Sequence, residues 1–201
     1  MPSTALALNA VFLLLAVGWR GWIQYRRTGD VGIRRPARSA APLEKLAGAL
    51  LAVGAAGLLI VPAGSLLGAV SPIRALDRPA VHGLGVLLAC SGIGLSVLAE
   101  FQMGDSWRVG VDPSESTSLV QHGLFASIRN PIYSGMLLFS LGLFCLVPSL
   151  LSGAAGVVLV LGVQLQVRGV EEPYLARRHG ETYRDYARAA GRFVPGIGRL
   201  R

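Results

Sequence analysis

The sequence has few cysteines and few charged residues, and each scarcity excludes a class of protein. Two cysteines are too few for a disulfide-stapled secreted scaffold, and Cys90 and Cys145 both lie in apolar runs typical of small buried hydrophobes. Charged residues make up 15% of the chain and apolar residues 52%, which excludes disorder because such a chain would collapse. The mean hydropathy of +0.54 is too high for a water-soluble domain of this length.

Acidic residues are scarce as well, since 11 of them face 19 lysines and arginines and leave a net charge of +8. We expect no nucleic-acid partner, because the basic residues form no stripe interleaved with aromatic residues and no known reading motif. The three histidines lack the spacing of metal ligands, so we expect no metal. Membrane topology explains the positive charge better.

Five apolar segments predict membrane spans, because about 20 apolar residues cross roughly 30 Å of hydrocarbon. No charge interrupts the chain between Arg129 and Arg168, which is too long a stretch for one helix, so we divide it at Pro148 and Ser149 into a tight helical hairpin. Pro62 is expected to kink or end the second span. The predicted spans are residues 5–23, 46–70, 81–99, 132–147 and 150–167.

The end of the first span carries the residue types favoured at a membrane surface. Arg20 is expected to snorkel to the headgroups there, next to the rings of Trp19, Trp22 and Tyr25. A cleaved signal peptide fits less well, because nothing basic precedes the span and no convincing small-residue cleavage site follows it.

The arginine distribution predicts the orientation. Residues 20–45 carry seven lysines and arginines, whereas the loop between the second and third spans has only Arg74 and Arg78. By the positive-inside rule the first of these loops is cytoplasmic, and so are residues 100–129 and the arginine-rich tail after residue 167. We therefore expect an integral protein of the plasma (inner) membrane with its N-terminus outside and its C-terminus in the cytoplasm.

The expected fold is an all-α polytopic membrane protein with about five transmembrane helices, a helical hairpin and a C-terminal cytoplasmic helical segment. We divide the chain into residues 1–78, with the first two spans and the basic loop, and residues 79–201, with the remaining spans, the cytoplasmic loop 100–130 and the tail. Tyr183, Tyr186 and Phe193 stand among arginines, which predicts an amphipathic segment lying on the membrane surface.

Polar residues gather at the cytoplasmic side of the second half, in segments 101–111, 119–135 and 168–186. On an α-helix Arg168 would share a face with Glu171 and Glu172, three and four residues later, and can pair with them. Adjacent helical positions point about 100° apart, so the second carboxylate can face a pocket and accept hydrogen bonds from an ammonium or hydroxyl group. An ordinary interfacial ion pair explains the spacing equally well.

A helix start signal precedes the hairpin. Asn130 can cap the first turn, and Pro131 suits the first helical position. Capping does not explain Arg129 and Tyr133, which place a guanidinium donor and an aromatic ring at the same helix mouth. His122 lies in segment 119–135, eight residues before Asn130.

Together these residues resemble the isoprenylcysteine carboxyl methyltransferases and the related phospholipid methyltransferases. Segment 103–111 looks like the stretch that precedes the motif in bacterial members. Asn130 stands where His is usual, and Phe125 replaces a common Tyr. The shared pattern runs through Leu119-Val120, Gly123, Phe125, Arg129-Asn130-Pro131-Ile132-Tyr133-Ser134-Gly135, the apolar hairpin, Glu171-Glu172-x-x-Leu175, Gly180, Tyr183 and Tyr186.

The resemblance implies an integral membrane enzyme that uses S-adenosylmethionine, with its active site on the cytoplasmic side. A lipophilic acceptor would enter from the bilayer; membrane lipids are the other expected partners, and no obligate protein partner is inferred. The candidate catalytic residues are Arg168, Glu172 and Tyr133. The candidate cofactor-binding residues are Leu119, Val120, His122, Gly123, Phe125, Arg129, Asn130, Tyr133, Glu171 and Glu172.

Gly92 and Gly94 have two readings. They match a Gly-x-Gly that the phospholipid enzymes use in the preceding span, and this resemblance implies a cofactor contact. Glycines in a span also let helices approach closely, so packing is the alternative.

Methyl transfer is an in-line displacement at a carbon already activated by a sulfonium, so the protein has mainly to align donor and acceptor and exclude water. For a carboxylate acceptor Arg168 is the candidate orienting group, because a guanidinium holds two oxygens at once; this role conflicts with pairing to Glu171. A phospholipid amine or a small thiol is the alternative acceptor and would favour an acidic or aromatic pocket.

Two further alternatives change the activity itself. An NADPH-dependent sterol-type membrane reductase would use Arg177, Arg178 and Arg184 for the cofactor phosphates. Positive-inside anchoring is the plainer explanation of these arginines. The other alternative is a noncatalytic membrane protein, which the paired acids and the Arg-Asn-Pro-x-Tyr segment disfavour.

Overall fold

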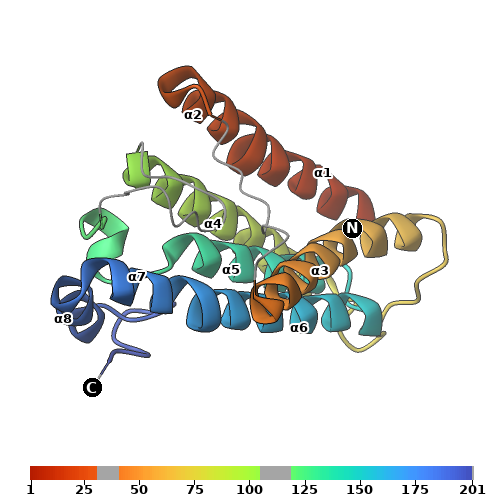
Figure 1. The fold of residues 1–201 in the computed structure, drawn as a ribbon. Coiled ribbons are helices and arrows are strands. Elements are labelled where there is room, and N and C mark those ends of the chain that lie inside the picture. Colours follow the sequence, from red (N-terminus) through yellow and green to blue (C-terminus); the bar gives the residue numbers. More distant parts are fainter. Residues whose placement is uncertain (31–40, 105–118, 201) are drawn as a thin grey trace.

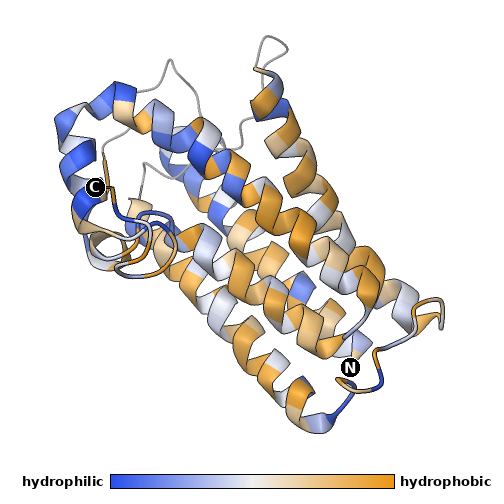
Figure 2. Cartoon of the chain, turned by 90° about the horizontal axis from the view of Figure 1, so that it is seen from below, coloured by the Kyte–Doolittle hydropathy of each residue, from blue (hydrophilic) through white to orange (hydrophobic). Residues whose placement is uncertain are grey.

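The computed structural model describes residues 1–30, 41–104 and 119–200, and every regular element in these ranges is helical. Figure 1 shows the helices as a bundle with the two termini at opposite ends, and Figure 2 shows the same placement from another side. In chain order the elements are α1 (Pro2–Phe12), the π-helical η1 (Leu13–Trp19), α2 (Arg20–Thr28), α3 (Pro42–Leu66), α4 (Pro79–Met103), the 3₁₀ turn η3 (Gly123–Ala126), α5 (Pro131–Leu146), α6 (Leu150–Leu165), the π-helical η4 (Gln166–Glu171), α7 (Glu172–His179) and α8 (Glu181–Ala189).

Five apolar helices correspond to the five predicted spans. Four are long and apolar enough to cross a membrane, namely Pro2–Thr28, Pro42–Leu66, Pro79–Met103 and Leu150–His179, and α5 is a shorter apolar helix of 16 residues. Figure 2 shows that the long helices are mostly hydrophobic, whereas hydrophilic residues concentrate around the C-terminal helices. The prediction of an all-α polytopic membrane protein is confirmed.

The predicted hairpin turns at Pro148 and Ser149, between α5 and α6. Ser149 and Ser152 form a capping box, in which each hydroxyl accepts the backbone N–H of the other residue at 3.1 and 3.0 Å. The Ser152 hydroxyl also donates to the Val147 carbonyl at 2.6 Å. All three residues are buried, so these bonds satisfy polar groups that the bilayer could not.

The proline in the second span does not end it. Pro62 is buried inside α3, which continues for another turn to Leu66. A proline removes only one helical hydrogen bond, and close to a helix end this loss affects few residues.

Arg20 does not snorkel outward as expected. The residue is buried at 2% exposure, and its Nη2 donates to the carbonyl of Gly104 at the end of α4. The π-helical η1 directly precedes it, and its wider turns change which residues face the bundle. Trp19, Trp22 and Tyr25 are exposed at this end of the helix, as an interfacial aromatic belt requires.

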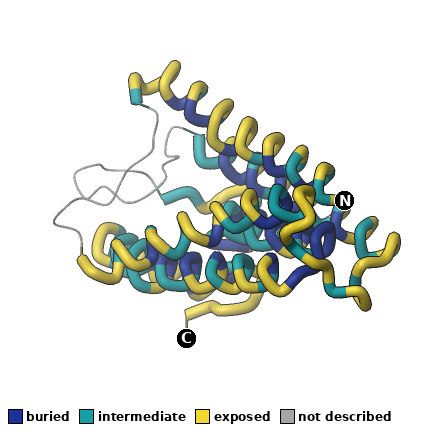
Figure 3. Tube along the Cα trace, turned by 90° about the vertical axis from the view of Figure 1, so that its right-hand side faces the viewer, coloured by how far each residue is buried: buried dark blue, intermediate teal, exposed yellow. Residues whose placement is uncertain are grey.

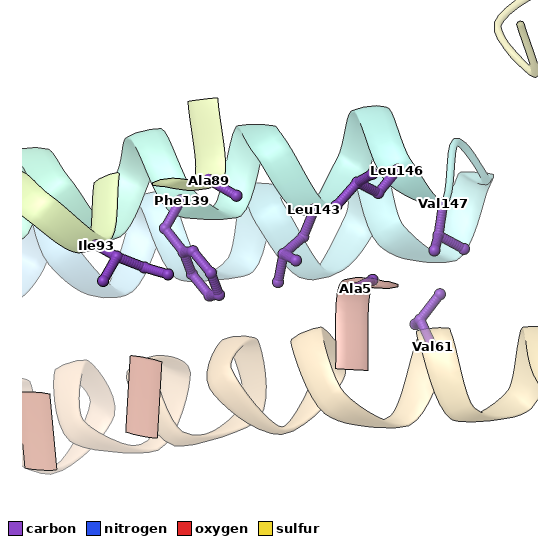
Figure 4. Packing of buried hydrophobic residues seen from close by; sticks show 8 residues of the cluster. All are labelled: Ala5, Val61, Ala89, Ile93, Phe139, Leu143, Leu146 and Val147. Atoms are coloured by element: carbon purple, nitrogen blue, oxygen red, sulfur yellow. The ribbon is translucent and has the colours of Figure 1, made fainter. Parts of the chain in front are cut away.

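Glycines hold α4 and α5 close together. A Cβ on Gly92 would lie 2.5 Å from the Phe139 nitrogen, and one on Gly142 would lie 2.5 Å from the Ala89 nitrogen, so the two backbones nearly touch. Phe139 also stacks on Phe12 of α1 at a ring distance of 4.6 Å. Figure 4 shows the buried apolar cluster that joins α1, α3, α4 and α5: Ala5, Val61, Ala89, Ile93, Phe139, Leu143, Leu146 and Val147.

The outer surface of the bundle is exposed, as Figure 3 shows along the first helix, and many of its exposed residues are large and apolar. Leu14, Leu87 and Val53 are all more than half exposed, although they are large apolar residues. Such a surface is stable only against lipid, so the helices present one face to each other and the other to the bilayer.

Candidate functional site

Two adjacent glutamates lie where η4, the continuation of the apolar helix α6, passes into α7. Glu171 ends η4 and Glu172 begins α7. The Oε1 atom of Glu171 accepts two hydrogen bonds, from the Tyr133 hydroxyl at 2.6 Å and from Gln166 Nε2 at 3.1 Å. Tyr133 belongs to the first turn of α5, so this carboxylate joins the start of the hairpin to its end.

The pairing of Arg168 with Glu171 that the sequence suggested is not formed. Arg168 is exposed, and it makes no ion pair with any residue that the structure describes. The cause is the π-helical winding of η4, in which hydrogen bonds connect residues five apart. Gln166, five residues before Glu171, therefore takes the place beside the carboxylate that α-helical spacing would give to Arg168.

Glu172 is held by two guanidinium groups. Arg129 donates to its Oε1 from Nε at 3.2 Å and from Nη2 at 2.8 Å. Arg192 donates to Oε1 from Nε at 2.9 Å, and its Nη2 lies 2.9 Å from Oε2. The hydrogen bond to Glu172 raises the pKa of Arg192.

All five N–H donors of Arg129 are used within the chain. Besides the two bonds to Glu172, Nη1 donates to the carbonyls of Ala187 and Ala190, and Nη2 donates to the Gly198 carbonyl at 3.0 Å. The residue is only 6% exposed. Its predicted contact with the cofactor stays a prediction, and in this structure such a contact would require one of these bonds to open.

The chain after α8 folds back onto the start of α5. Backbone bonds join Arg129 N to Gly191 O at 2.8 Å and Asn130 N to Arg192 O at 3.1 Å. Asn130 occupies the N-cap position, but its side chain donates to the Arg192 carbonyl at 3.2 Å and accepts no capping bond. The expected capping by Asn130 is therefore wrong, because the returning segment takes its amide.

The apolar face of α8 lies against protein rather than on the membrane surface as expected. Tyr183 and Tyr186 are 2% and 7% exposed, and the Tyr186 hydroxyl donates to the carbonyl of the buried Phe125 at 2.7 Å. Burial raises the pKa of Tyr183 to about 12 and that of Tyr186 further. This face packs on Leu119, Leu175 and Ala176.

The loop before α5 is anchored on the end of α4. Gln102 Oε1 accepts the Leu124 N–H at 2.7 Å, and Gly123 has a φ of 60° at a position where a Cβ would displace the Gln102 side chain. The Ser96 hydroxyl donates to the Ile132 carbonyl at 3.2 Å. These bonds fix the height at which the loop and Tyr133 meet the bundle.

The family comparison matches this region. The phospholipid methyltransferase family model covers residues 80–182, which run from α4 into α8 and include both glutamates. The chain belongs to the phospholipid methyltransferase family. It is therefore a membrane methyltransferase.

A solved structure shares the fold of this methyltransferase. It is described as the eukaryotic intramembrane Ras methyltransferase ICMT (isoprenylcysteine carboxyl methyltransferase). The likeness covers 98% of this chain and 78% of that chain, with a TM-score of 0.57 and 20% sequence identity. At this identity the likeness concerns the fold. No curated protein matches the chain.

The structure of the methyltransferase brings some predicted site residues together and leaves others apart. Tyr133 meets Glu171, Arg129 meets Glu172, and Phe125 supports α8. His122 is exposed, and Leu119 and Val120 are half-buried. Most of segment 103–111 lies outside the described residues, and no three His, Cys, Asp or Glu residues within the described ranges are placed to hold a metal ion.

The two glycines of the Gly-x-Gly face different ways. Gly92 packs against the α5 backbone, whereas a Cβ on Gly94 would meet nothing within 4 Å. Packing therefore explains Gly92, and the contact predicted for Gly94 stays a prediction.

The sequence patterns did not single out Arg192 and Gln166, which are also parts of this methyltransferase site. Arg192 is one of many arginines in the tail, although its neighbours Gly191 and Phe193 set it apart from the helical residues before it. Gln166 was missed because its contact depends on π-helical winding, for which the sequence carries no evident signal.

Proposed function

We propose that this methyltransferase takes its methyl group from S-adenosylmethionine and transfers it to a lipophilic acceptor that enters from the bilayer. The proposal rests on the hydrogen bonding of the Glu171 carboxylate. Tyr133 and Gln166 both bind Oε1, and no described residue donates a hydrogen bond to Oε2. A carboxylate oxygen with spare acceptor capacity at the end of a span suits a ligand with ammonium and hydroxyl groups.

The residues around Glu171 fit the donor. The methyl donor has an ammonium group and ribose hydroxyls, and a carboxylate can accept hydrogen bonds from both. Tyr133 adds an aromatic ring beside this carboxylate. The backbone of Leu119, Val120 and Gly123 would provide the remaining contacts that the resemblance implies. When bound, S-adenosylmethionine supplies a methyl group activated by a sulfonium; the chain has then to orient the reactants and exclude water.

For the acceptor we propose a carboxylate, as in carboxyl O-methylation. Arg168 is exposed at the end of the apolar helix, where its guanidinium can hold both oxygens of an acceptor that remains in the bilayer. A carboxylate needs no base, because it is already nucleophilic when ionised.

An amine is the second candidate acceptor, and one observation favours it. Two of the arginines beside the site, Arg129 and Arg192, are both engaged by Glu172, so the spare polar group near Tyr133 is the carboxylate of Glu171. A carboxylate stabilises a cationic headgroup and can accept the proton that an ammonium must lose.

We further propose that the site faces the cytoplasm of the plasma (inner) membrane. Arg177 and Arg178 on α7 are exposed at the end of the bundle that holds the glutamates, as the positive-inside rule expects of a cytoplasmic face.

The test is a binding titration of the detergent-purified protein with S-adenosylmethionine and, side by side, with NADPH. We expect saturable binding of the methyl donor, weakened roughly ten- to a hundredfold by Glu171→Gln, because a charged hydrogen-bond acceptor is lost. Glu181→Gln, at an exposed site on α8, is the matched control and should bind normally. Binding of NADPH alone would replace this proposal with the reductase alternative.

A further inference from the structure

Arg192 lies ten residues beyond the part of the chain that the family model matches, yet its side chain reaches into that part. Its Nε donates to Glu172 Oε1 at 2.9 Å, and its Nη2 lies 2.9 Å from Glu172 Oε2. A guanidinium that contacts both oxygens fixes the rotation of a carboxylate as well as its position. The hydrogen bonds of Arg129 to Glu172 both end on Oε1, so Arg192 supplies the hold on the second oxygen.

The backbone of Arg192 is itself fixed from two sides. Within the returning segment, Arg192 N donates to Ile197 O at 2.7 Å, and Gly191 has no room for a Cβ beside the Val194 carbonyl. Toward α5, the Ser134 hydroxyl donates to the Phe193 carbonyl at 2.6 Å. A side chain mounted on so constrained a backbone can position its partner accurately.

The charges around Glu172 distinguish a positioning role of Arg192 from a role in folding. Glu172 faces two guanidinium groups, and Arg129 is the more buried of the two, with every donor satisfied. Without Arg192 the carboxylate keeps the charge of Arg129, so no buried ion loses its counterion. What is lost is the bond from Arg192 Nε to Oε1 and the contact of Arg192 Nη2 with Oε2.

We infer that Arg192 is a positioning residue of the methyl-transfer site, holding Glu172 through both oxygens and thereby keeping the adjacent Glu171 on Tyr133. The inference rests on the proposed function, because it assigns the spare oxygen of Glu171 to the methyl donor. Glu172 begins α7 and directly follows Glu171 in a continuous helix, so anchoring the Glu172 side chain on Arg192 holds the helix backbone that also carries Glu171. The C-terminal segment therefore acts on the site without touching the reacting groups.

The experiment compares Arg192→Ala, Arg192→Lys and the control Arg188→Ala, which removes an exposed ion pair with Asp185 on α8. Binding of S-adenosylmethionine is titrated below the thermal midpoint of each variant. We expect Arg192→Ala to weaken binding roughly tenfold or more, since small misplacements at a site have large effects. Arg192→Lys keeps the charge but loses the planar fork, so it should recover binding only in part, and Arg188→Ala should match the wild type.

A second readout needs no ligand. In a double-mutant cycle on the thermal midpoint of the free protein, Arg192→Ala and Glu172→Gln should be non-additive, because both remove the same contact. Additive effects would overturn the inference. So would a lowered midpoint for Arg192→Ala with unchanged affinity for S-adenosylmethionine, which is the result of a purely structural role. If the wild type itself does not bind S-adenosylmethionine, the proposed function fails first and the inference fails with it.

Discussion

The hydroxyl of Tyr133 donates to Glu171 at 2.6 Å, across 38 positions of the sequence. Tyr133 lies at the start of α5 and Glu171 in the continuation of α6. Their hydrogen bond therefore joins the two helices of the hairpin at the end that carries the site. Because Gln166 shares the same oxygen atom, Glu171 is held in one orientation even without a ligand.

Tyr133→Phe should lower the free energy of unfolding by about 1.5 kcal/mol and also weaken binding of S-adenosylmethionine. The phenyl ring keeps its packing, and only the bond that orients Glu171 is removed. Chemical unfolding in detergent and a binding titration measure the two effects. Tyr25→Phe, at an exposed position, is the control. Unchanged affinity in the Tyr133 variant would show that the orientation of Glu171 does not matter for the donor.

Gly142→Ala should destabilise the protein by about 1–3 kcal/mol, because the new methyl group would lie 2.5 Å from the Ala89 nitrogen and force α4 and α5 apart. Gly94→Ala is the matched control in the same helix pair, since a methyl group there meets nothing within 4 Å. Thermal unfolding of both variants checks the contrast. The same Gly94 variant, titrated with S-adenosylmethionine, also tests the cofactor contact predicted for Gly94.

Ser149→Ala should cost about 1 kcal/mol of stability, because it removes the N-cap of α6 at a buried turn. Ser71→Ala, in an exposed stretch before α4, should change nothing measurable. Equal midpoints for the two variants would mean that lipid headgroups or water satisfy the turn instead.

Stability should decline above pH 10 in a way that depends on Tyr183. The unfolded chain loses the phenolic proton at its ordinary pKa of 10.0, whereas the folded chain keeps it until about 12. The contribution of Tyr183 is therefore complete below pH 10 and is lost as the pH rises from there through about 12. Thermal midpoints on both sides of pH 10 should fall less steeply in Tyr183→Phe than in the wild type.

Arg168→Ala separates the candidate acceptors. The residue is exposed and not paired with Glu171, so its loss should leave binding of S-adenosylmethionine unchanged. With a lipid carboxylate as acceptor, KM should rise roughly tenfold or more, because a two-point ionic contact is lost. With a phospholipid amine as acceptor, activity should stay the same; methyl transfer to each acceptor distinguishes the two.

The sequence was sufficient to predict the five spans, the hairpin turn at Pro148 and Ser149 and the meeting of the Tyr133 region with the glutamates. These features follow from the length of apolar runs, from turn residues and from a local motif. The division of the chain at residue 78 stays a prediction, although Ala5 and Val61 share one buried cluster with Phe139 from the second part.

Two features of the site could not be predicted from the sequence. The contact of Gln166 with Glu171 depends on the π-helical register of η4. The same kind of winding in η1 precedes the buried Arg20. The role of Arg192 depends on a tertiary fold-back of the tail. Local patterns record neither, because both follow from how helices pack after they have formed.

The helix formed by α6, η4 and α7 also sets the depth of the site in the bilayer. Glu171 follows the first residue of α6, Leu150, by 21 positions, which places it about 32 Å along the helix axis, close to the roughly 30 Å thickness of the hydrocarbon layer. The carboxylate thus lies near the boundary between the hydrocarbon layer and the aqueous phase. The proposed water-soluble methyl donor can approach the carboxylate from the aqueous side and the proposed lipid acceptor from the hydrocarbon side, so the two can meet without either one leaving its own phase.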